Sequence, residues 1–135
     1  MLQHIATVYR AAQFYSHAAH NQISGCSFFA DHSFAGEVYD SMTEAYDSLV
    51  ERAIGTGEMI DLFKTNVDAA AMIKDFKLDT AKDIFGQFEF AEKAIQRELK
   101  NASKDASYGT DNLLAGLADD SEVRSYKIKQ RLKNI

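Results

Sequence analysis

Two histidines and two carboxylates stand out as possible metal ligands. His20 and His32 are the ends of the segment HNQISGCSFFADH, and Asp47 and Glu51 follow with a spacing of four residues. Two imidazoles and two carboxylates together suit iron or zinc. Single histidines near helix ends, and acidic pairs at i, i+4, are more often solvated surface residues. The spacing alone therefore leaves both interpretations open.

Apolar residues recur at helical spacing in four long stretches, with no convincing alternation typical of strands. We expect helices over residues 2–23, 28–54, 79–99 and 109–134. Small residues at 24–27 separate the first two helices, Gly55 and Gly57 end the second, and Asp79 is the expected cap of the third. The segment TNVDAAAMIKDF between the second and third helices predicts a crossover that contains a short helix.

This order of elements predicts an all-α fold. Two long helices, a long connection and two more long helices describe a ferritin-like four-helix bundle with one crossover. An up-down bundle without a cofactor has the same periodicity and remains the alternative. The length of 135 residues predicts a single domain over 1–135.

The spacing of the candidate ligands limits how they can meet. None of the four histidines has a glutamate three positions before it, so the Glu-x-x-His pairs of a di-iron site inside a bundle are absent. His32 and Asp47 are fifteen residues apart, roughly 22 Å along a helix. One chain cannot bring them to one metal ion, whereas two chains packed about a twofold axis can.

Composition predicts a soluble, cytoplasmic protein. The hydrophobic content of 46% and charged content of 26% are ordinary for a globular chain. The single Cys26 excludes an intramolecular disulfide and points to a reducing compartment. We find no leader pattern and no apolar run of membrane-spanning length. The net charge of −5 argues against a general attraction to nucleic acid.

The run HNQISGCSFFADHSFAGEVYDSMTEAYDSLVER resembles the signature of the Dps (DNA-protection-during-starvation) family of mini-ferritins. The segment YGTDNLLAGL is similar to the opening of that family's last helix. The resemblance extends from about residue 10 to residue 132. The residues that match the signature at the family's spacing are His20, Gly25, Phe28, His32, Phe34, Asp47, Glu51 and Arg52.

The resemblance implies a hollow homo-oligomer, in that family a dodecamer, with iron-oxidising centres at twofold interfaces. His20 and His32 would come from one subunit, and Asp47 and Glu51 from the other. The implied activity is oxidation of Fe(II) by hydrogen peroxide or dioxygen, coupled to storage of ferric iron in the shell and protection from oxidative damage. Zinc or another divalent metal could substitute for iron. A prokaryotic-type cytoplasmic location is also implied.

Three departures from the family pattern limit these expectations. Gly36 stands where the family usually has an aspartate, so a second iron position is expected to be weak or absent. Asn21 replaces the tryptophan beside the first histidine. Many members of the family bind DNA through a basic N-terminal tail, which this sequence lacks, so DNA binding by such a tail is not expected. The C-terminal segment RSYKIKQRLKNI is nevertheless basic. The alternative is a DNA-protecting shell, or a degenerate one with weak or no ferroxidase activity.

Other candidate residues have weaker support. His17 could touch a metal together with His20, and Cys26 matches no family ligand. Acidic residues around the start of the last helix could line a pore for iron or simply favour the helix N-terminus, which is the preferred interpretation for the first of them. These acidic residues are Asp111, Asp119 and Asp120.

Overall fold

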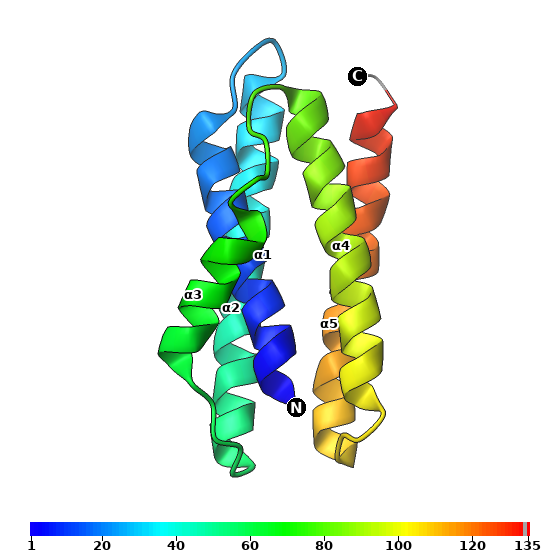
Figure 1. Cartoon of the computed structure of the whole chain (residues 1–135). Coiled ribbons are helices and arrows are strands. Elements are labelled where there is room, and N and C mark those ends of the chain that lie inside the picture. The colour runs from blue at the N-terminus through cyan, green and yellow to red at the C-terminus, as the bar shows by residue number, and fades with distance from the viewer. Residues whose placement is uncertain (134) are drawn as a thin grey trace.

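The computed structural model describes residues 1–133 and 135, and within these residues every regular element is a helix (Figure 1). The elements are α1 (Leu2–Gln22), α2 (Phe28–Gly55), α3 (Leu62–Ile73), α4 (Ala81–Ser103) and α5 (Tyr108–Leu132). The helices predicted over 2–23, 28–54 and 109–134 correspond closely to α1, α2 and α5, and position 134, the predicted end of the last helix, lies outside the described residues. The short crossover helix is also confirmed, although it begins a few residues earlier than predicted.

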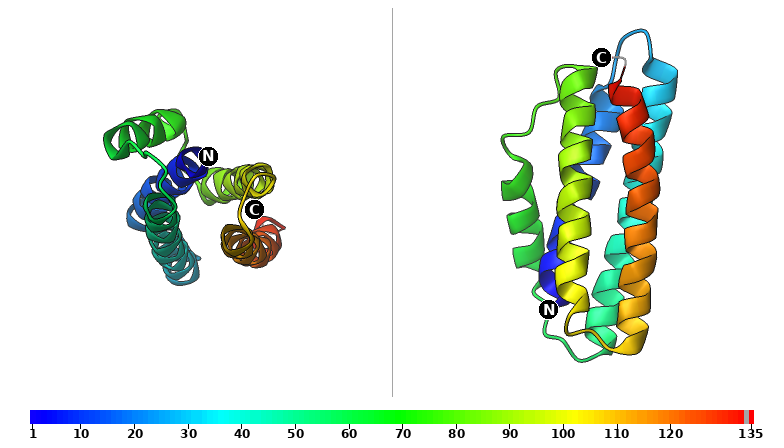
Figure 2. Two further views of the ribbon diagram at one scale, coloured as in Figure 1. Left: turned by 90° about the horizontal axis from the view of Figure 1, so that it is seen from below. Right: turned by 90° about the vertical axis from the view of Figure 1, so that its right-hand side faces the viewer.

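The four long helices form two antiparallel pairs. The α1 helix packs most extensively on α2, and α4 packs on α5, while α1 also contacts α4. The crossover helix α3 lies on the outside of α1, as Figure 2 shows from below. Contact between α2 and α5 is sparse. The all-α bundle with a helix in its long connection is thus the predicted one.

Polar side chains cap the N-termini of α1, α3 and α4, and the cap of α4 differs from the prediction. The carboxylate of Glu58 accepts hydrogen bonds from the first backbone N–H groups of α1, and Asp61 caps α3. The cap of α4 is Thr80, whose hydroxyl accepts from the Asp83 N–H at 3.0 Å. The prediction of Asp79 was wrong by one residue because both residue types are good caps and the backbone geometry decides between them.

Two glycines mark the predicted breaks between helices. Gly25 has a φ of +102° in the turn between α1 and α2, and Gly57 has a φ of +87° just beyond the end of α2. A side chain is strained at such angles, which explains glycine at both places. The turn after α1 is short, so the end of α1 and the start of α2 lie side by side.

The buried apolar side chains of the bundle form two clusters. One cluster surrounds Tyr9, Leu49 and Ile95 near the N-terminal end of α1, and the other surrounds Tyr15 and Phe88. A charge that is buried in such an interior must be paired.

A buried ion pair, formed by Glu92 of α4 and Arg124 of α5, lies inside the bundle. Arg124 Nε donates to Glu92 Oε2 at 2.8 Å, its Nη2 donates to Oε1 at 3.1 Å, and the Ser121 hydroxyl donates to Oε1 at 2.6 Å. Glu92 is 2% exposed. Burial acts to lower the pKa of Arg124, but the hydrogen bonds and the charge of Glu92 together outweigh it and raise that pKa. A guanidinium group therefore supplies the positive charge beside this interior carboxylate.

None of the helices in the part of the chain that the structure describes is both long and apolar enough to cross a membrane.

Candidate metal site

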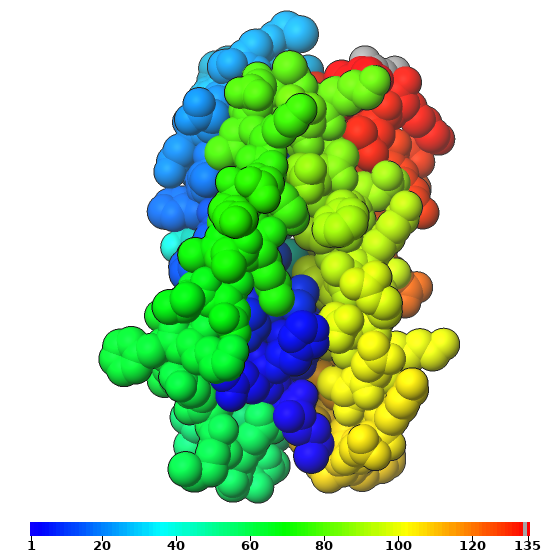
Figure 3. Space-filling model, in the orientation of Figure 1, coloured from blue at the N-terminus to red at the C-terminus, as the bar shows by residue number. Residues whose placement is uncertain are grey.

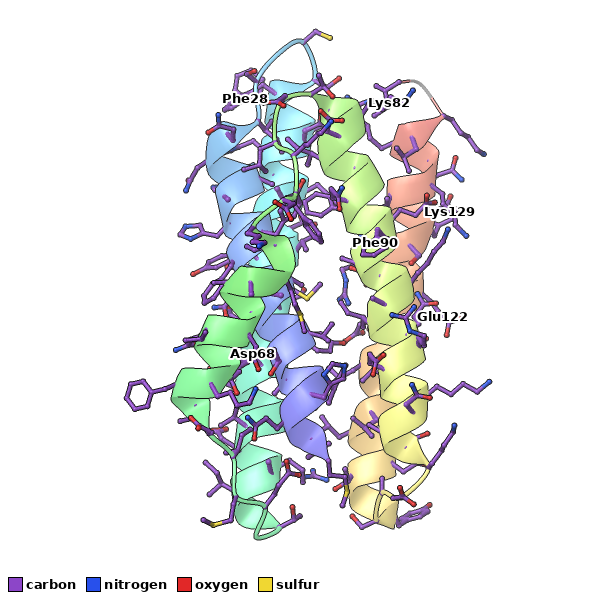
Figure 4. The ribbon with its side chains drawn as sticks, in the orientation of Figure 1. Phe28, Asp68, Lys82, Phe90, Glu122 and Lys129 are labelled. Carbon is purple, nitrogen blue, oxygen red and sulfur yellow. The ribbon has the colours of Figure 1, made fainter. Side chains whose placement is uncertain are left out.

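The structure brings His20 and His32 together at the end of the bundle where α1 passes into α2. His20 lies in the last turn of α1, and His32 lies near the start of α2. Their rings stack with centroids 3.7 Å apart and planes inclined by 21°. Phe28 stacks on the other face of the histidine pair, 4.8 Å from the His32 centroid, and Figure 4 labels it at this end of the molecule. The two candidate ligands are thus held as one rigid unit.

Reciprocal hydrogen bonds fix the chemistry of both rings. His20 Nδ1 lies 2.8 Å from the His32 carbonyl oxygen, and His32 Nδ1 lies 2.7 Å from the His20 carbonyl oxygen. A carbonyl oxygen can only accept, so each Nδ1 must carry the proton. In a neutral imidazole the lone pair is then on Nε2, which is the form in which histidine binds a metal through that atom. In both rings the unprotonated Nε2 is therefore the atom that can bind a metal ion.

Gly36 lies directly beside this pair. A Cβ atom built at residue 36 would lie 3.1 Å from both Cε1 and Nδ1 of His20. The residue supplies no carboxylate to the pair, in agreement with the departure seen in the sequence.

The two candidate carboxylates lie elsewhere on α2. Asp47 and Glu51 are both exposed, and Asp47 is fifteen residues from His32 along one continuous helix, about 22 Å by its rise. Within the described residues, no three side chains of the types His, Cys, Asp and Glu come close enough to hold a metal ion. One subunit therefore presents a pair of nitrogens and a separate pair of carboxylates.

No basic side chain of the described residues lies within ion-pairing distance of Asp47 or Glu51. The neighbouring Arg52 turns away, and its Nη1 donates to the Thr110 hydroxyl at 3.3 Å, which ties α2 to the start of α5. Two like charges at i, i+4 repel each other when no cation lies between them. The acidic pair is thus available to an external cation.

The weaker candidates are dispersed. His17 is exposed and stacks on Tyr39, with ring centroids 4.3 Å apart, whereas His20 stacks on His32, so these two histidines have different partners. Cys26 is an exposed free thiol in the turn before α2.

The three aspartates of the last helix do not form one group. Asp111 lies in the first turn of α5, where a negative charge favours the helix dipole. Asp119 and Asp120 lie in the middle of α5 and not around its start, because this helix runs from Tyr108 to Leu132. Asp120 lines a groove of about 260 Å³ between α2 and α5 that also contains Glu37 and Lys127.

The basic end of the chain is less free than its sequence suggests. Arg124 is bound to Glu92 inside the bundle, and Arg131 makes two hydrogen bonds, of 2.9 and 3.0 Å, to the buried carboxylate of Asp31. Two of its basic groups therefore hold the fold together, and Lys129 is among those left on the surface (Figure 4).

A second hollow differs in character from the histidine site. It lies between α1, α3 and α4, on the face that Figure 3 shows, with a volume of about 330 Å³ and a mainly apolar lining. Phe90 borders it and is 62% exposed (Figure 4). At its edge, His4 pairs with Glu98 at 3.2 Å. One histidine and one carboxylate are too few to hold a metal ion tightly.

The chain is similar to known proteins in sequence and in fold. The chain is 25% identical over 113 residues to the DNA protection during starvation protein of Helicobacter pylori. The aligned region covers 82% of this chain and 78% of that protein. The crystal structure of Dps92 from Deinococcus radiodurans superposes with a TM-score of 0.85 over 99% of this chain and 84% of that one, at 19% identity. The chain is thus similar in sequence to one Dps protein and in fold to another. No family model matches the sequence.

The ferritin-like fold of a Dps protein is therefore confirmed. Sequence reasoning singled out the two histidines but missed two of their neighbours, Phe28 as a stacking partner and Gly36 as a residue beside His20. It also missed the ion pair of Glu92, for which a signal existed. Glu92 lies at the apolar spacing of Phe88, Ile95 and Leu99, where a charge predicts a buried partner.

Proposed function

We propose that this protein is a Dps-type mini-ferritin that binds and oxidises Fe(II) at sites shared between two subunits and stores the ferric product inside a hollow shell. The observation that carries the proposal is the histidine pair, in which reciprocal hydrogen bonds leave Nε2 of both rings free to bind a metal. The fold and the similarity to Dps proteins support the same interpretation.

Each half of the proposed site lacks what the other supplies. The N-terminal part of α2 and the end of α1 offer two imidazole nitrogens as metal ligands, and the C-terminal part of α2 offers two carboxylates with no ion-pair partner among the described residues. If the second helices of two subunits pack antiparallel about a twofold axis, His20 and His32 of one subunit face Asp47 and Glu51 of the other. The carboxylates then neutralise the charge of the iron ion, and the imidazoles complete a mixed ligand set that suits iron.

The ligands have different roles in this arrangement. His20 binds the iron ion together with the two carboxylates, and His32 orients a water molecule or a more weakly bound second ion. Each Fe(II) ion gives one electron, so two ions are oxidised for each hydrogen peroxide that is reduced to water. An open coordination position for the oxidant is required, and Gly36 supplies no carboxylate that would occupy such a position.

The same absence favours a second candidate, a shell that assembles but oxidises iron slowly. Two irons held side by side would deliver both electrons to one peroxide in a single encounter. A site that holds one iron tightly must instead rely on a second, loosely held ion. The rate of oxidation at the site distinguishes the two candidates.

Fe(II) titration of the assembled protein with hydrogen peroxide tests the proposal. We expect iron to be oxidised faster than in buffer and to co-elute with the protein in size-exclusion chromatography. Glu51→Gln removes a ligand charge and should abolish the acceleration, whereas Glu44→Gln changes an exposed glutamate of the same helix and should not. Equal behaviour of the two variants would contradict the proposal.

Assembly is a separate requirement. Light scattering at micromolar concentration should report a large particle, for which twelve subunits are expected from the resemblance. A monomer or simple dimer would exclude storage within a shell, because a hollow particle needs many copies.

A further inference from the structure

We propose that Gly36 is the positioning residue of the histidine pair, because the space left by its missing side chain holds the imidazole ring of His20. The inference deepens the proposed function, since it concerns the orientation of a proposed iron ligand. It also makes a claim about the metal-free protein that can be tested separately.

The His20 ring is confined on three sides. Its face stacks on His32 at 3.7 Å, its Nδ1 is held 2.8 Å from the His32 carbonyl oxygen, and its Nδ1–Cε1 edge lies against Gly36. A Cβ at residue 36 would approach this edge to 3.1 Å, which is closer than ordinary carbon contacts of about 3.5–4.0 Å. The ring would have to move by a few tenths of an ångström.

That movement would reach the metal-binding atom. Cε1 is bonded to Nε2, so pressure on Cε1 displaces the lone pair that we assign to the metal. Because His20 and His32 exchange hydrogen bonds and stack, a shift of one ring also disturbs the other. Ligands to a metal must be held within about 0.5 Å of their working geometry.

Gly36 differs in this respect from the other glycines inside helices. Alanine at Gly86 or Gly116 would meet no atom within 4 Å, and at Gly109 it would make an ordinary contact at 3.5 Å with Arg52. Glycine in the middle of a helix costs stability relative to alanine. At Gly36 this loss of stability is offset because the missing side chain leaves room for the His20 ring. No such offset exists at Gly86 or Gly116.

The first test uses the metal-free protein and a double-mutant cycle. Gly86→Ala should raise the midpoint of thermal unfolding by about 2–4 °C, because alanine favours the helix. Gly36→Ala should give no such rise in the wild-type background and should give it in a His20→Ala background, where the ring is gone. An equal rise for Gly36→Ala in both backgrounds would overturn the inference, whatever the protein does with iron.

The second test measures ligand geometry without iron oxidation. Zn²⁺ titration by calorimetry and the absorption spectrum of bound Co²⁺ are recorded for the assembled protein and its variants. Gly36→Ala should weaken Zn²⁺ binding about tenfold and change the Co²⁺ spectrum, as is usual when the support of a ligand is disturbed. Gly86→Ala should match the wild type in both measurements.

The outcomes separate the two proposals. If the wild type binds neither ion, the proposed metal site fails, while the unfolding cycle still decides the role of Gly36. If the wild type binds Zn²⁺ and Gly36→Ala binds it equally well with the same Co²⁺ spectrum, the positioning role fails and the proposed function stands.

Discussion

Mixing two inactive variants tests whether the site is shared between subunits. His20→Ala damages the nitrogen half of the proposed site, and Glu51→Gln damages the carboxylate half. About 22 Å of helix separates His32 from Asp47 within one chain, so neither half can be completed from its own subunit. Each variant alone should therefore lose the accelerated oxidation of Fe(II).

The magnitude of the recovery follows from counting. In a mixed dimer, one site combines both damaged halves and the other combines both intact halves. Random assembly of equal amounts gives mixed dimers in about half of the cases, so about a quarter of all sites should be restored. The assay is the initial rate of Fe(II) oxidation per subunit, measured after the two variants are unfolded together and reassembled.

A matched control uses two variants of the same half. His20→Ala mixed with His32→Ala leaves every nitrogen half damaged, so no site should be restored. Recovery in this control, or no recovery in the complementing mixture when light scattering shows full reassembly, would refute the shared site. The first result would mean that the histidines act independently, and the second that both halves lie in one subunit or do not belong together.

Four further outcomes follow from the rest of the molecule. Burial raises the pKa of Tyr9 and of Tyr15, so both side chains stay neutral in the folded state, whereas they ionise above about pH 10 in the unfolded chain. The free energy of unfolding should therefore be constant below that pH and fall above it. Denaturant unfolding measured from about pH 8 to 11 checks this expectation. The Tyr9 hydroxyl has no hydrogen-bond partner among the described residues, so Tyr9→Phe should be neutral or stabilising and should reduce the alkaline loss. Glu92→Ala should cost about 3–5 kcal/mol of unfolding free energy, because it leaves the Arg124 guanidinium buried without its carboxylate; a cost near that of an exposed glutamate would contradict the pairing. Because Arg124 and Arg131 are engaged in ion pairs, gel-shift assays should show little or no DNA retention at physiological salt, and clear retention would revive the DNA-protecting alternative.

The sequence by itself determined the helices and the pairing of the first two. Apolar spacing and glycine placement depend on a few neighbouring residues, so the bounds of α1 and α2 could be predicted closely. The short turn around Gly25 forces the end of α1 beside the start of α2, and this brings His20 and His32 to one level. The separation of the carboxylates also followed from the sequence, because the rise of a helix is fixed.

Only the tertiary structure decided how the histidines are used. Periodicity places a residue on a face, but it does not specify which atom of an imidazole is hydrogen bonded. The reciprocal bonds of His20 and His32 depend on the distance between two backbones, and so does the role of Gly36. In the sequence Gly36 was only an absent ligand, whereas in the fold its lack of a side chain is space for a ring.

The buried Glu92 and the basic end of the chain show the same difference. A run of basic residues at a helix end could face solvent or carboxylates brought from far along the sequence. Asp31 and Arg131 are one hundred positions apart, and their pairing exists only once α2 and α5 are placed in the bundle. Local patterns fix elements through neighbouring residues, while charges removed from water take whichever partners the packing of the helices brings to them.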